Sequence, residues 1–566
     1  MKSRLAIFPL SLLLLSCAPG GSSSASSSLP NSEQESRAPL TEVAFRDYSS
    51  QVDGRFNNEL FYRNDLLQDM GDPMVVYEDG YFYASGTHGT TSFRCFRSKD
   101  LTNWERLGDM FVPEPGSWST KDLWAPDIQK IGDKWYLYYT ASYANNGTTN
   151  CQLGVAVSDH VYGPYKQVPG EDGTIATPPF SLYEEGKAKY CTILDSHVFQ
   201  DDDGELYMYF SYDMKKCRTQ DYGGYPVQEI WGAKMDSPTS WDKSTLTRLL
   251  SPGLAKLSDN ERTIDWETWS TSFDQTMECL EGPYMIKHNG TYFLTYSGNS
   301  YVDTVYNVGY ATSSSPLGEY VKPNSHPLEN MLLGVPGNDG EYINTRYLGF
   351  QTGTGHASIC KVGDEYMFAF HAHQNRKKWG EDNNSNRALG LDYLYFTEDN
   401  VPYTRGPTWS INRLPNAVTG YSNLAYGKTV EGQGENLSYL VDNFSNRGHN
   451  KGQTDTEVVK EANFPAGESR FKIDLGEEKT VKFLLIGNSY DYQRKIDYID
   501  EIRFDGDIGV KNVVFNQNYV NRETSWIFPH SCFVVELEEE VRTRYVEITV
   551  SNASEFSLSE VEVYGK

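Results

Sequence analysis

The chain reads Asp72-Pro-Met-Val-Val-Tyr-Glu-Asp-Gly-Tyr-Phe-Tyr-Ala-Ser over residues 72–85. A polar residue stands first, a short apolar run follows, and an Asp-Gly pair separates this run from a second one that is rich in aromatic residues. Asp-Gly accommodates the positive φ angles of a tight hairpin turn. The stretch therefore predicts two antiparallel strands with one distinctive residue at the start of the first strand.

Four later stretches repeat this pattern and begin at Trp124, Asp195, Glu281 and His356. Each has a turn in which Gly stands beside Asp or Asn, followed by an aromatic strand. The starts are spaced by 52, 71, 86 and 75 residues, and a four-stranded propeller blade needs roughly 40–50, so long loops between strands account for the excess. We predict an all-β chain in which residues 51–415 form a five-bladed β-propeller. A large β-sandwich with coincidentally similar hairpins is the alternative.

The composition agrees with a large globular protein. The 566 residues include 50 Lys and Arg against 77 Asp and Glu, which gives a formal net charge of −27. A general nucleic-acid binder carries the opposite sign, so we expect no nucleic-acid partner. Aromatic residues make up 14% of the chain, enough for a large core, and this excludes a disordered acidic tail.

The first residue of each innermost propeller strand points toward the central axis, so the leading residues are expected to form one ring. Three of these leading residues, Asp72, Asp195 and Glu281, carry carboxyl groups. Burial and mutual repulsion separate the pKa values of such groups, so that one stays protonated while another is ionised. Hydrolysis of a glycosidic bond requires such groups, an acid for the leaving oxygen and a base for water. Sugars pack flat apolar faces on aromatic rings, which makes the tryptophan the expected substrate-binding residue. The predicted ring consists of Asp72, Trp124, Asp195, Glu281 and His356.

From about residue 60 to 415, these motifs resemble glycoside hydrolase family 43, whose members are inverting enzymes with a five-bladed propeller. The resemblance implies that Asp72, followed by Pro, is the general base and that Glu281, in Glu-Gly-Pro-Tyr, is the general acid. It implies that Asp195 is a pKa modulator that also orients the substrate. Trp124-Ala-Pro-Asp and Gly353-Thr-Gly-His match the motifs of the second and fifth blades.

Three further points concern this ring. Many family members have Pro after the third-blade aspartate, whereas this chain has Ser196-His197, which leaves the subfamily and the substrate open. Glu278 lies three residues before Glu281, but only Glu281 fits the hairpin register. The resemblance also places a calcium or sodium ion near His356 in the central channel, although the chemistry itself is expected to need no cofactor.

The first residues resemble a bacterial lipoprotein signal. Lys2 and Arg4 precede an apolar run that ends at Ser16-Cys17. Residues 1–17 are therefore predicted to be a signal peptide in which Cys17 carries the lipid, and residues 18–50 a Ser/Gly-rich linker; an ordinary cleaved signal is the alternative. We expect an exported protein at the bacterial cell surface or in the periplasm that touches the membrane only through this anchor.

Residues 420–566 show the alternation of apolar and polar residues that is typical of half-buried strands, as in Arg544-Tyr-Val-Glu-Ile-Thr-Val. Their order resembles a discoidin-like jelly roll, the β-sandwich fold of galactose-binding-like domains. The resemblance implies a carbohydrate-binding module. A domain with a purely structural role is the alternative.

The leading hypothesis is an inverting glycosidase that acts on polysaccharide or oligosaccharide, as an exo-acting α-L-arabinofuranosidase. Loop insertions at Cys217–Pro226 and Leu257–Met277 favour this exo action if they close one end of the channel. β-Xylosidase, endo-arabinanase and β-galactosidase or galactofuranosidase activities remain alternatives within the family. A non-catalytic surface carbohydrate-binding protein is the rival from another class, and the presence of all three carboxyl groups argues against it.

Overall fold

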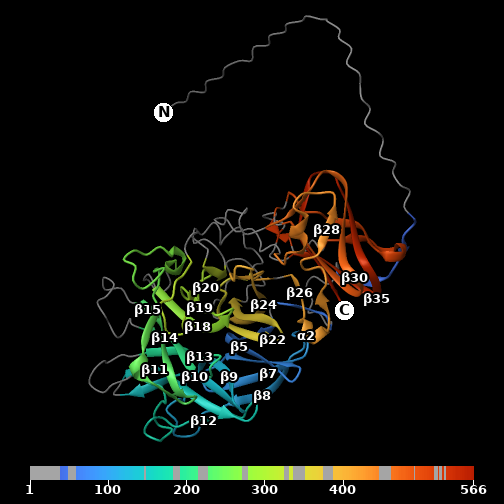
Figure 1. The fold of residues 1–566 in the computed structure, drawn as a ribbon. Helices are drawn as coiled ribbons and strands as arrows, with labels where there is room; N and C mark the ends of the chain where they lie inside the picture. Colours follow the sequence, from blue (N-terminus) through green and yellow to red (C-terminus); the bar gives the residue numbers. More distant parts are fainter. Residues whose placement is uncertain are drawn as a thin grey trace, which may run out of the picture. The chain divides into compact units, whose positions relative to one another are not determined.

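The computed structural model consists almost entirely of strands (Figure 1). Contacts divide the chain into residues 1–39 and residues 40–566. The predicted signal peptide and most of the predicted linker lie outside the residues that the structure describes. Within the described part, no helix combines the length and the apolar character that a membrane crossing requires. The structure describes residues 38–46, 48, 59–64, 66–145, 148–182, 192–213, 227–269, 278–323, 330–334, 351–373, 386–408, 410–444, 460–489, 491, 493–515, 520–521, 526–527 and 531–566.

Five antiparallel four-stranded units follow one another along the chain, and the third carries an extra two-residue strand, β16 (Ser240–Trp241). A short parallel pairing of Val227 and Gln228 with Glu278 and Cys279 joins the third and fourth units into one sheet. Blade one contains β5 (Gly71–Glu78), β6 (Tyr81–Thr87), β7 (Phe93–Ser98) and β8 (Glu105–Phe111), and blade two contains β9 (Trp124–Ile131), β10 (Lys134–Asn145), β11 (Thr148–Ser158) and β12 (Lys166–Gln167). Blade three contains β13 (Thr192–Gln200), β14 (Leu206–Asp213), β15 (Val227–Ser237) and β17 (Thr247–Leu250). Blade four contains β18 (Glu278–His288), β19 (Thr291–Gly298), β20 (Asn307–Ser313) and β21 (Met331–Leu333), and blade five contains β22 (Gly355–Val362), β23 (Glu365–His373), β24 (Arg387–Phe396) and β25 (Pro402–Thr404).

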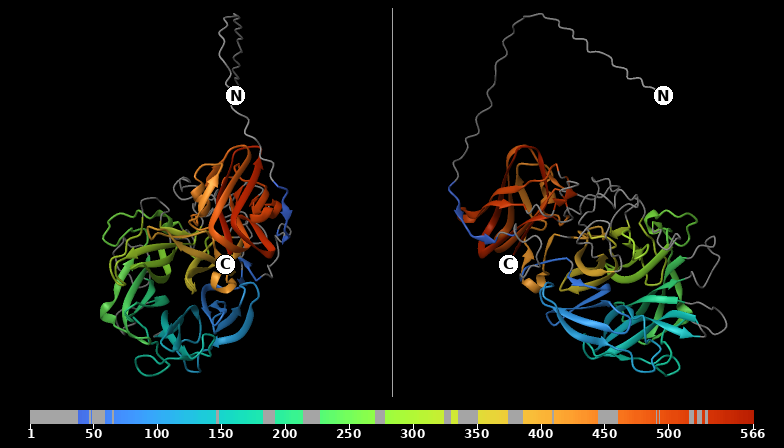
Figure 2. Two further views of the ribbon diagram at one scale, coloured as in Figure 1. Left: turned by 45° about the vertical axis from the view of Figure 1, so that its right-hand side comes forward. Right: turned by 180° about the vertical axis from the view of Figure 1, so that it is seen from behind.

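The blades close into a ring. The inner strands β5, β9, β13, β18 and β22 contact one another in this order, and β22 packs against β5. Hydrogen bonds also join the beginning of the domain to its end, because β4 (Leu67–Gln68) pairs with β24 and β3 (Phe61–Arg63) pairs with β26 (Ile411–Arg413). The two views of Figure 2 show the blades from further sides. The predicted five-bladed propeller is confirmed.

A second β-structure follows the short helix α2 (Asn416–Thr419). Its longest strands, β30 (Gly467–Asn488) and β35 (Cys532–Asn552), pair with each other through two register shifts and enclose an apolar core. This arrangement agrees with the predicted β-sandwich. Its other strands are β27 (Ser422–Asn423), β28 (Thr429–Gly432), β29 (Ala462–Phe464), β31 (Tyr498–Phe504), β32 (Ile508–Val514), β33 (Val520–Asn521), β34 (Trp526–Ile527) and β36 (Phe556–Gly565). Two short 3-10 helices of the C-terminal domain lie at Leu437–Val441 and Asp505–Asp507, and two of the propeller lie at Lys243–Thr245 and Asp265–Thr268.

Part of the predicted linker belongs to this C-terminal domain. Strand β1 (Thr41–Glu42) pairs with β32, and β2 (Phe45–Arg46) pairs with β35. The buried hydroxyl of Tyr48 donates a hydrogen bond to Glu536 of β35. Residues 41–46 read Thr-Glu-Val-Ala-Phe-Arg, a composition that suits a strand better than the Ser/Gly-rich stretch before it. The C-terminal domain is therefore built from both ends of the chain.

Candidate active site

All five inner hairpins contain the same irregularity. In each, two residues of the inner strand face one residue of the second strand, which is a β-bulge. Such a bulge bends the strand and redirects its side chains. The first bulge residues are Asp72, Ala125, Asp195, Gly282 and His356, and all five have positive φ, between 46° and 58°.

The bulge refines the predicted register by one residue in two blades. Trp124 and Glu281 are not the first residues of their bulges; each stands directly before one and still pairs across, with Thr140 and Ser297. Neighbouring residues of a regular strand point to opposite faces, so a one-residue offset matters. In these two blades the positive φ falls on the small residues Ala125 and Gly282.

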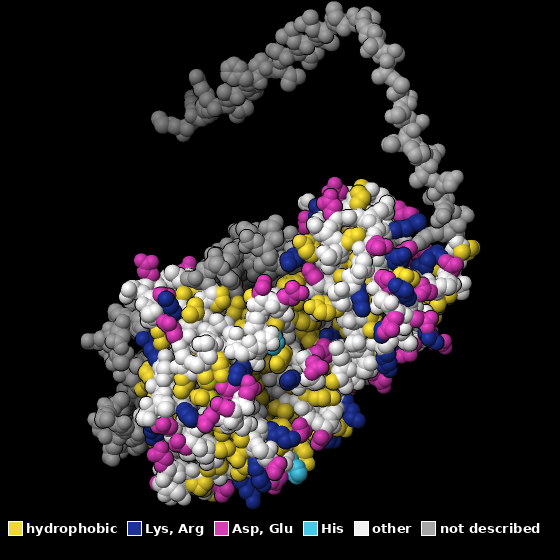
Figure 3. All heavy atoms as spheres, viewed as in Figure 1, with side chains coloured by type: hydrophobic (Ala, Val, Ile, Leu, Met, Phe, Trp, Pro, Cys, Tyr) yellow, Lys and Arg dark blue, Asp and Glu magenta, His cyan; other side chains and the backbone are white. Residues whose placement is uncertain are grey.

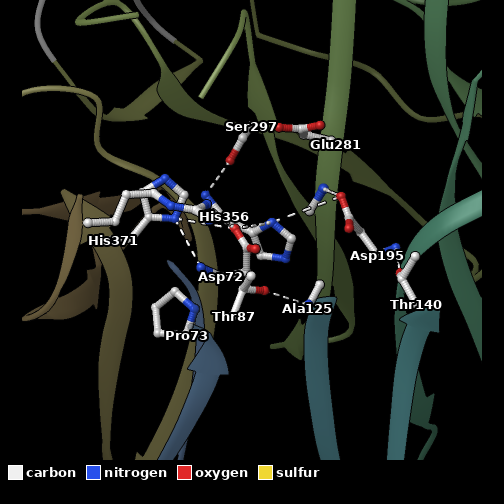
Figure 4. Close-up of polar contacts among 12 residues, drawn as sticks. Asp72, Pro73, Thr87, Ala125, Thr140, Asp195, Glu281, Ser297, His356 and His371 are labelled. Carbon is white, nitrogen blue, oxygen red and sulfur yellow. Dashed lines mark hydrogen bonds and ion pairs between the residues drawn. The ribbon is translucent and has the colours of Figure 1, made fainter. Parts of the chain in front are cut away.

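The backbone N–H group of each first bulge residue donates its hydrogen bond to a side chain and not to a backbone carbonyl of a neighbouring strand. Ala125 donates to Thr87 Oγ1 at 2.9 Å, Asp195 to Thr140 Oγ1 at 2.8 Å and His356 to Ser297 Oγ at 2.7 Å (Figure 4). Positive φ is costly for residues other than glycine and persists only where surrounding contacts impose it. These hydrogen bonds supply such contacts at the ring.

Asp72 lies among cationic and imidazole groups. Its Oδ1 is 2.6 Å from Arg387 Nη1 and 3.3 Å from His356 Nδ1, and its backbone N–H donates to His371 Nδ1 at 3.1 Å. Burial opposes ionisation of Asp72, but Arg387 and His356 outweigh it and hold the pKa of Asp72 well below its usual value. Burial and Arg387 lower the pKa of His371 to about 3, so this ring is neutral. Asp72 is therefore an ionised carboxylate at neutral pH.

Asp195 has the opposite environment. Its Oδ2 accepts the backbone N–H of Gly282 at 3.3 Å, which links it to the strand that carries Glu281. Burial, together with the charges of Glu281 and Asp72, raises the pKa of Asp195 well above its usual value. Asp195 therefore retains its proton under conditions in which Asp72 has lost its own.

Two residues that the sequence analysis did not identify hold the Glu281 carboxyl group. Tyr306 donates its hydroxyl to Oε1 at 2.7 Å, and Gln228 donates its amide to Oε2 at 3.1 Å. Burial raises the pKa of Tyr306 well above its usual value, so its hydroxyl stays a donor. The Gly-Thr-Gly-His motif contributes indirectly, because a Cβ at Gly355 would fall 2.0 Å from the Tyr306 ring.

Arg387 and His371 were also missed, although both contact Asp72. Arg387 begins β24 and belongs to none of the recognised motifs. Only Gly71 offers a signal for it in the sequence, since a Cβ there would lie 2.1 Å from the Arg387 guanidinium carbon. A glycine directly before Asp72 thus leaves room for the cation that keeps Asp72 ionised.

Trp124 is half-buried at the start of β9, and no hydrogen bond or ring contact joins it to the other ring residues within the described part of the chain. Asp127 of the same motif is buried and accepts hydrogen bonds from the backbone N–H of Val198 and from His197 Nδ1. The His197 ring stacks on Tyr284 with centroids 3.8 Å apart. The Ser-His variant of the third-blade motif therefore connects blades two, three and four.

The expected ion near His356 remains a prediction. His356 Nδ1 lies 3.3 Å from Asp72 Oδ1 and 3.9 Å from Asp195 Oδ2, so this nitrogen faces carboxylates. Among the residues that the structure describes, no three His, Cys, Asp or Glu side chains are grouped as metal ligands. Calcium also prefers oxygen ligands to an imidazole nitrogen. The described residues do not fit such an ion, and no step of the reaction is derived from it.

Glu278 forms an ion pair with Arg262 and is buried. The choice of Glu281 over Glu278 as the acid remains a prediction. Of the two insertions predicted to close the channel, Cys217–Pro226 lies outside the described residues. Leu257–Met277 is described only as far as Trp269.

The two aspartates are expected to affect stability with opposite signs. A carboxyl group whose pKa is lowered by folding stabilises the folded protein at pH values above the unfolded pKa of about 4. A carboxyl group whose pKa is raised by folding stabilises the folded protein at low pH, and this contribution is lost as the pH rises through the folded pKa. At pH 7, Asp72→Asn should therefore lower the melting temperature and Asp195→Asn should raise it. Each change should be roughly 2–4 °C for every kcal/mol by which the free energy of unfolding changes. Calorimetry at pH 7 and below about pH 4, where the gain from Asp195→Asn should vanish, tests this. A lower melting temperature for Asp195→Asn at pH 7 would contradict the assignment.

Comparison with known proteins gives a family match. A model described as "Glycosyl hydrolases family 43" matches residues 62–402. An extracellular endo-α-(1→5)-L-arabinanase of Thermotoga petrophila is 27% identical over 295 residues, 46% of this chain and 52% of that protein. Endo-α-(1→5)-L-arabinanase 2 of Bacillus subtilis is 27% identical over 317 residues, 51% of this chain and 57% of that protein. The chain thus spans about half the length of these curated relatives.

Other relatives at low identity are named β-D-galactofuranosidase, β-xylosidase and exo-α-(1→5)-L-arabinofuranosidase. Among solved structures, that of a thermostable family-43 glycoside hydrolase is 26% identical with a TM-score of 0.48. The match covers 62% of this chain and 97% of that one.

Proposed function

The chain belongs to glycosyl hydrolase family 43, and from this membership we propose that it is an exported inverting glycosidase that releases terminal α-L-arabinofuranosyl residues from polysaccharide. The observation that carries the proposal is the contrast between two carboxyl environments. Arg387 and His356 keep Asp72 ionised against the effect of burial, whereas burial and the neighbouring carboxylates raise the pKa of Asp195, so that Asp195 retains its proton. Glycosidic hydrolysis with inversion needs both species at once.

In the proposed reaction, Asp72 accepts a proton from the water whose oxygen forms a bond to the anomeric carbon. Glu281 donates a proton to the glycosidic oxygen as its bond to that carbon breaks. Asp195, which accepts the Gly282 N–H at 3.3 Å, keeps the strand that carries the acid in place. Tyr306 and Gln228 orient the Glu281 carboxyl group, and Trp124 offers an aromatic surface to the sugar.

The choice of sugar is supported by the names of the relatives, several of which act on arabinan. An endo-α-1,5-arabinanase is the second candidate, because the relatives from Thermotoga petrophila and Bacillus subtilis carry that name. β-Xylosidase and galactofuranosidase activities have similar support, because relatives with these names are 25% and 24% identical and the exo-α-(1→5)-L-arabinofuranosidase is 24% identical. On the face drawn in Figure 3, Lys and Arg side chains are interspersed with Asp and Glu, which suits a neutral polymer better than a polyanion.

Hydrolysis of a panel of substrates tests this proposal. The panel contains p-nitrophenyl α-L-arabinofuranoside, β-D-xyloside, β-D-galactofuranoside and β-D-galactoside, with debranched arabinan beside them. We expect release from the arabinofuranoside and arabinose as the main product from arabinan. NMR of the first product formed should show inverted anomeric configuration.

Each other result has a defined meaning. Oligosaccharides from arabinan without release from any aryl glycoside would select the endo-arabinanase. Release of p-nitrophenol from another glycoside would assign the enzyme to that sugar and leave the proposed mechanism unchanged. No hydrolysis of any substrate by the folded protein would overturn the proposal in favour of a non-catalytic carbohydrate-binding protein.

The lipid anchor and the role of the C-terminal domain are also proposals. Export is supported by the first residues and by relatives that are named extracellular. Labelling of cells with radioactive palmitate should mark the wild-type protein and not Cys17→Ser. Equal labelling of both would contradict the anchor. For residues 420–566 we propose carbohydrate binding.

A further inference from the structure

A cavity of about 370 Å³ lies between the C-terminal domain and one end of blade five, where the turn from β22 to β23 and the last residues of β24 line it. This volume falls within the range of small-ligand pockets, roughly 300–1,000 Å³. Both domains contribute to its walls. The lining that matters here comprises Asp364, Tyr366 and Phe396 from blade five, and Ser422, Tyr426 and Asn443 from the C-terminal side.

The cavity is separate from the catalytic ring. Strand β22 carries His356 near one end, and Asp364 belongs to the turn beyond its other end. Eight residues of extended strand span roughly 25 Å. His288, which also lines the cavity, stands at the opposite end of β18 from Glu281. No short ligand in the cavity can therefore reach the reacting carboxyl groups.

The walls are held together by buried polar contacts between the domains. Arg405 Nη1 lies 2.7 Å from Glu562 Oε1, and the exposed fractions of these side chains are 4% and 2%. The Tyr403 hydroxyl donates to the backbone oxygen of Asn443 at 2.8 Å. The Arg413 guanidinium lies over the Tyr393 ring at 4.2 Å and over the Tyr564 ring at 5.0 Å. A cavity with fixed walls costs little ordering on binding.

The lining combines exposed aromatic surface with unused hydrogen-bonding groups. Tyr426 is 52% exposed, and no ring, cation or hydrogen-bond contact of its side chain occurs among the described residues. Within the same part of the chain, the Tyr366 hydroxyl and the Asp364 carboxylate have no hydrogen-bond partner. Arg413, the one cationic Lys or Arg side chain in the described lining, is paired with Glu365. Such a lining suits a neutral ligand that has flat apolar faces and many hydroxyl groups.

We propose that this cavity is a second carbohydrate-binding site, which holds a short segment of the polymer that the catalytic ring hydrolyses. The proposal rests on the proposed glycosidase function for the identity of the sugar. Polymer held at one site raises the local concentration of chain ends at the other, which strengthens the overall interaction with the polymer. The carbohydrate-binding role of the C-terminal domain then depends on its junction with the propeller.

Calorimetry with α-1,5-arabinotriose, and in parallel β-1,4-xylotriose, tests the site in the full chain carrying Glu281→Gln. One of the two probes should bind at two sites per chain. Adding Tyr426→Ala should weaken one of them about tenfold or more, the loss of one well-placed aromatic contact. Tyr498→Ala is the matched control, because Tyr498 is 46% exposed on the C-terminal domain and does not line the cavity.

Kinetics separate this proposal from the proposed function. In the wild-type background, Tyr426→Ala should leave hydrolysis of the aryl glycoside unchanged and raise KM for polymer severalfold. A single binding site, two sites that survive Tyr426→Ala, or an equal loss in Tyr498→Ala would each overturn the second site while hydrolysis stands. Absence of hydrolysis in wild type would instead overturn the proposed function, whatever the calorimetry shows.

Discussion

Asp72→Asn is expected to lower kcat/KM by about 10³-fold or more, for every substrate that the enzyme accepts. The amide cannot accept a proton from water, and the neighbouring Arg387 and His356 would then face a neutral group. The loss should be similar for an activated aryl glycoside and for an oligosaccharide, because water must be deprotonated in both reactions. Steady-state kinetics with the two substrate types measures this.

Asp201→Asn is the matched control for this variant. Asp201 is also a buried aspartate, with Lys287 Nζ at 2.7 Å, but it lies at the turn between β13 and β14, far from the bulge along the strand. Its activity should stay within about threefold of wild type, which is within 1 kcal/mol. A similar collapse of activity in both variants, or full activity in Asp72→Asn, would remove Asp72 from the role of base.

Glu281→Gln should show a loss that depends on the leaving group. An oligosaccharide leaves as a poor alkoxide and needs the proton of a general acid, so its hydrolysis should fall about 10³-fold or more. A p-nitrophenyl glycoside leaves as a stabilised phenolate, so the loss should be at least tenfold smaller. The ratio of kcat/KM values for the two substrates, compared with wild type, gives the result.

Glu278→Gln supplies the control for the acid. This residue has the same side chain, three positions earlier on the same strand, and pairs with Arg262 outside the bulge. Its substitution should lower stability and leave the ratio of the two substrates unchanged. A ratio that changes in Glu278→Gln and not in Glu281→Gln would reverse the assignment.

The repeated hairpins were readable from sequence because they are local. A turn dipeptide, an aromatic strand and a leading polar residue all lie within about fifteen residues of each other, and their fivefold recurrence implied a ring. The ring in turn placed Asp72, Asp195 and Glu281 on inner strands of three different blades, as the structure has them. The β-sandwich was likewise readable from alternation along single strands.

The groups that surround these carboxyl groups could not be predicted from the sequence. Arg387 is 315 residues from Asp72 along the chain, and Glu281 is held by Gln228 of β15 in blade three and by Tyr306, directly before β20 in blade four. The one-residue offset of Trp124 and Glu281 from the bulges could not be predicted from the sequence for a related reason. Backbone conformation at Ala125 is imposed by Thr87 of the neighbouring blade, and nothing in its own segment favours a positive φ.

The sequence by itself determined the propeller, the C-terminal β-sandwich and the three carboxyl groups, because turns, strand periodicity and motif residues are encoded over short distances. Only the tertiary structure decided that Asp72 is ionised and that Asp195 retains its proton. Burial and the charges that approach from other blades set that balance. The same holds for the strands that residues 41–46 add to the C-terminal sheet and for the cavity at the junction. Both depend on surfaces that come together only when the chain folds.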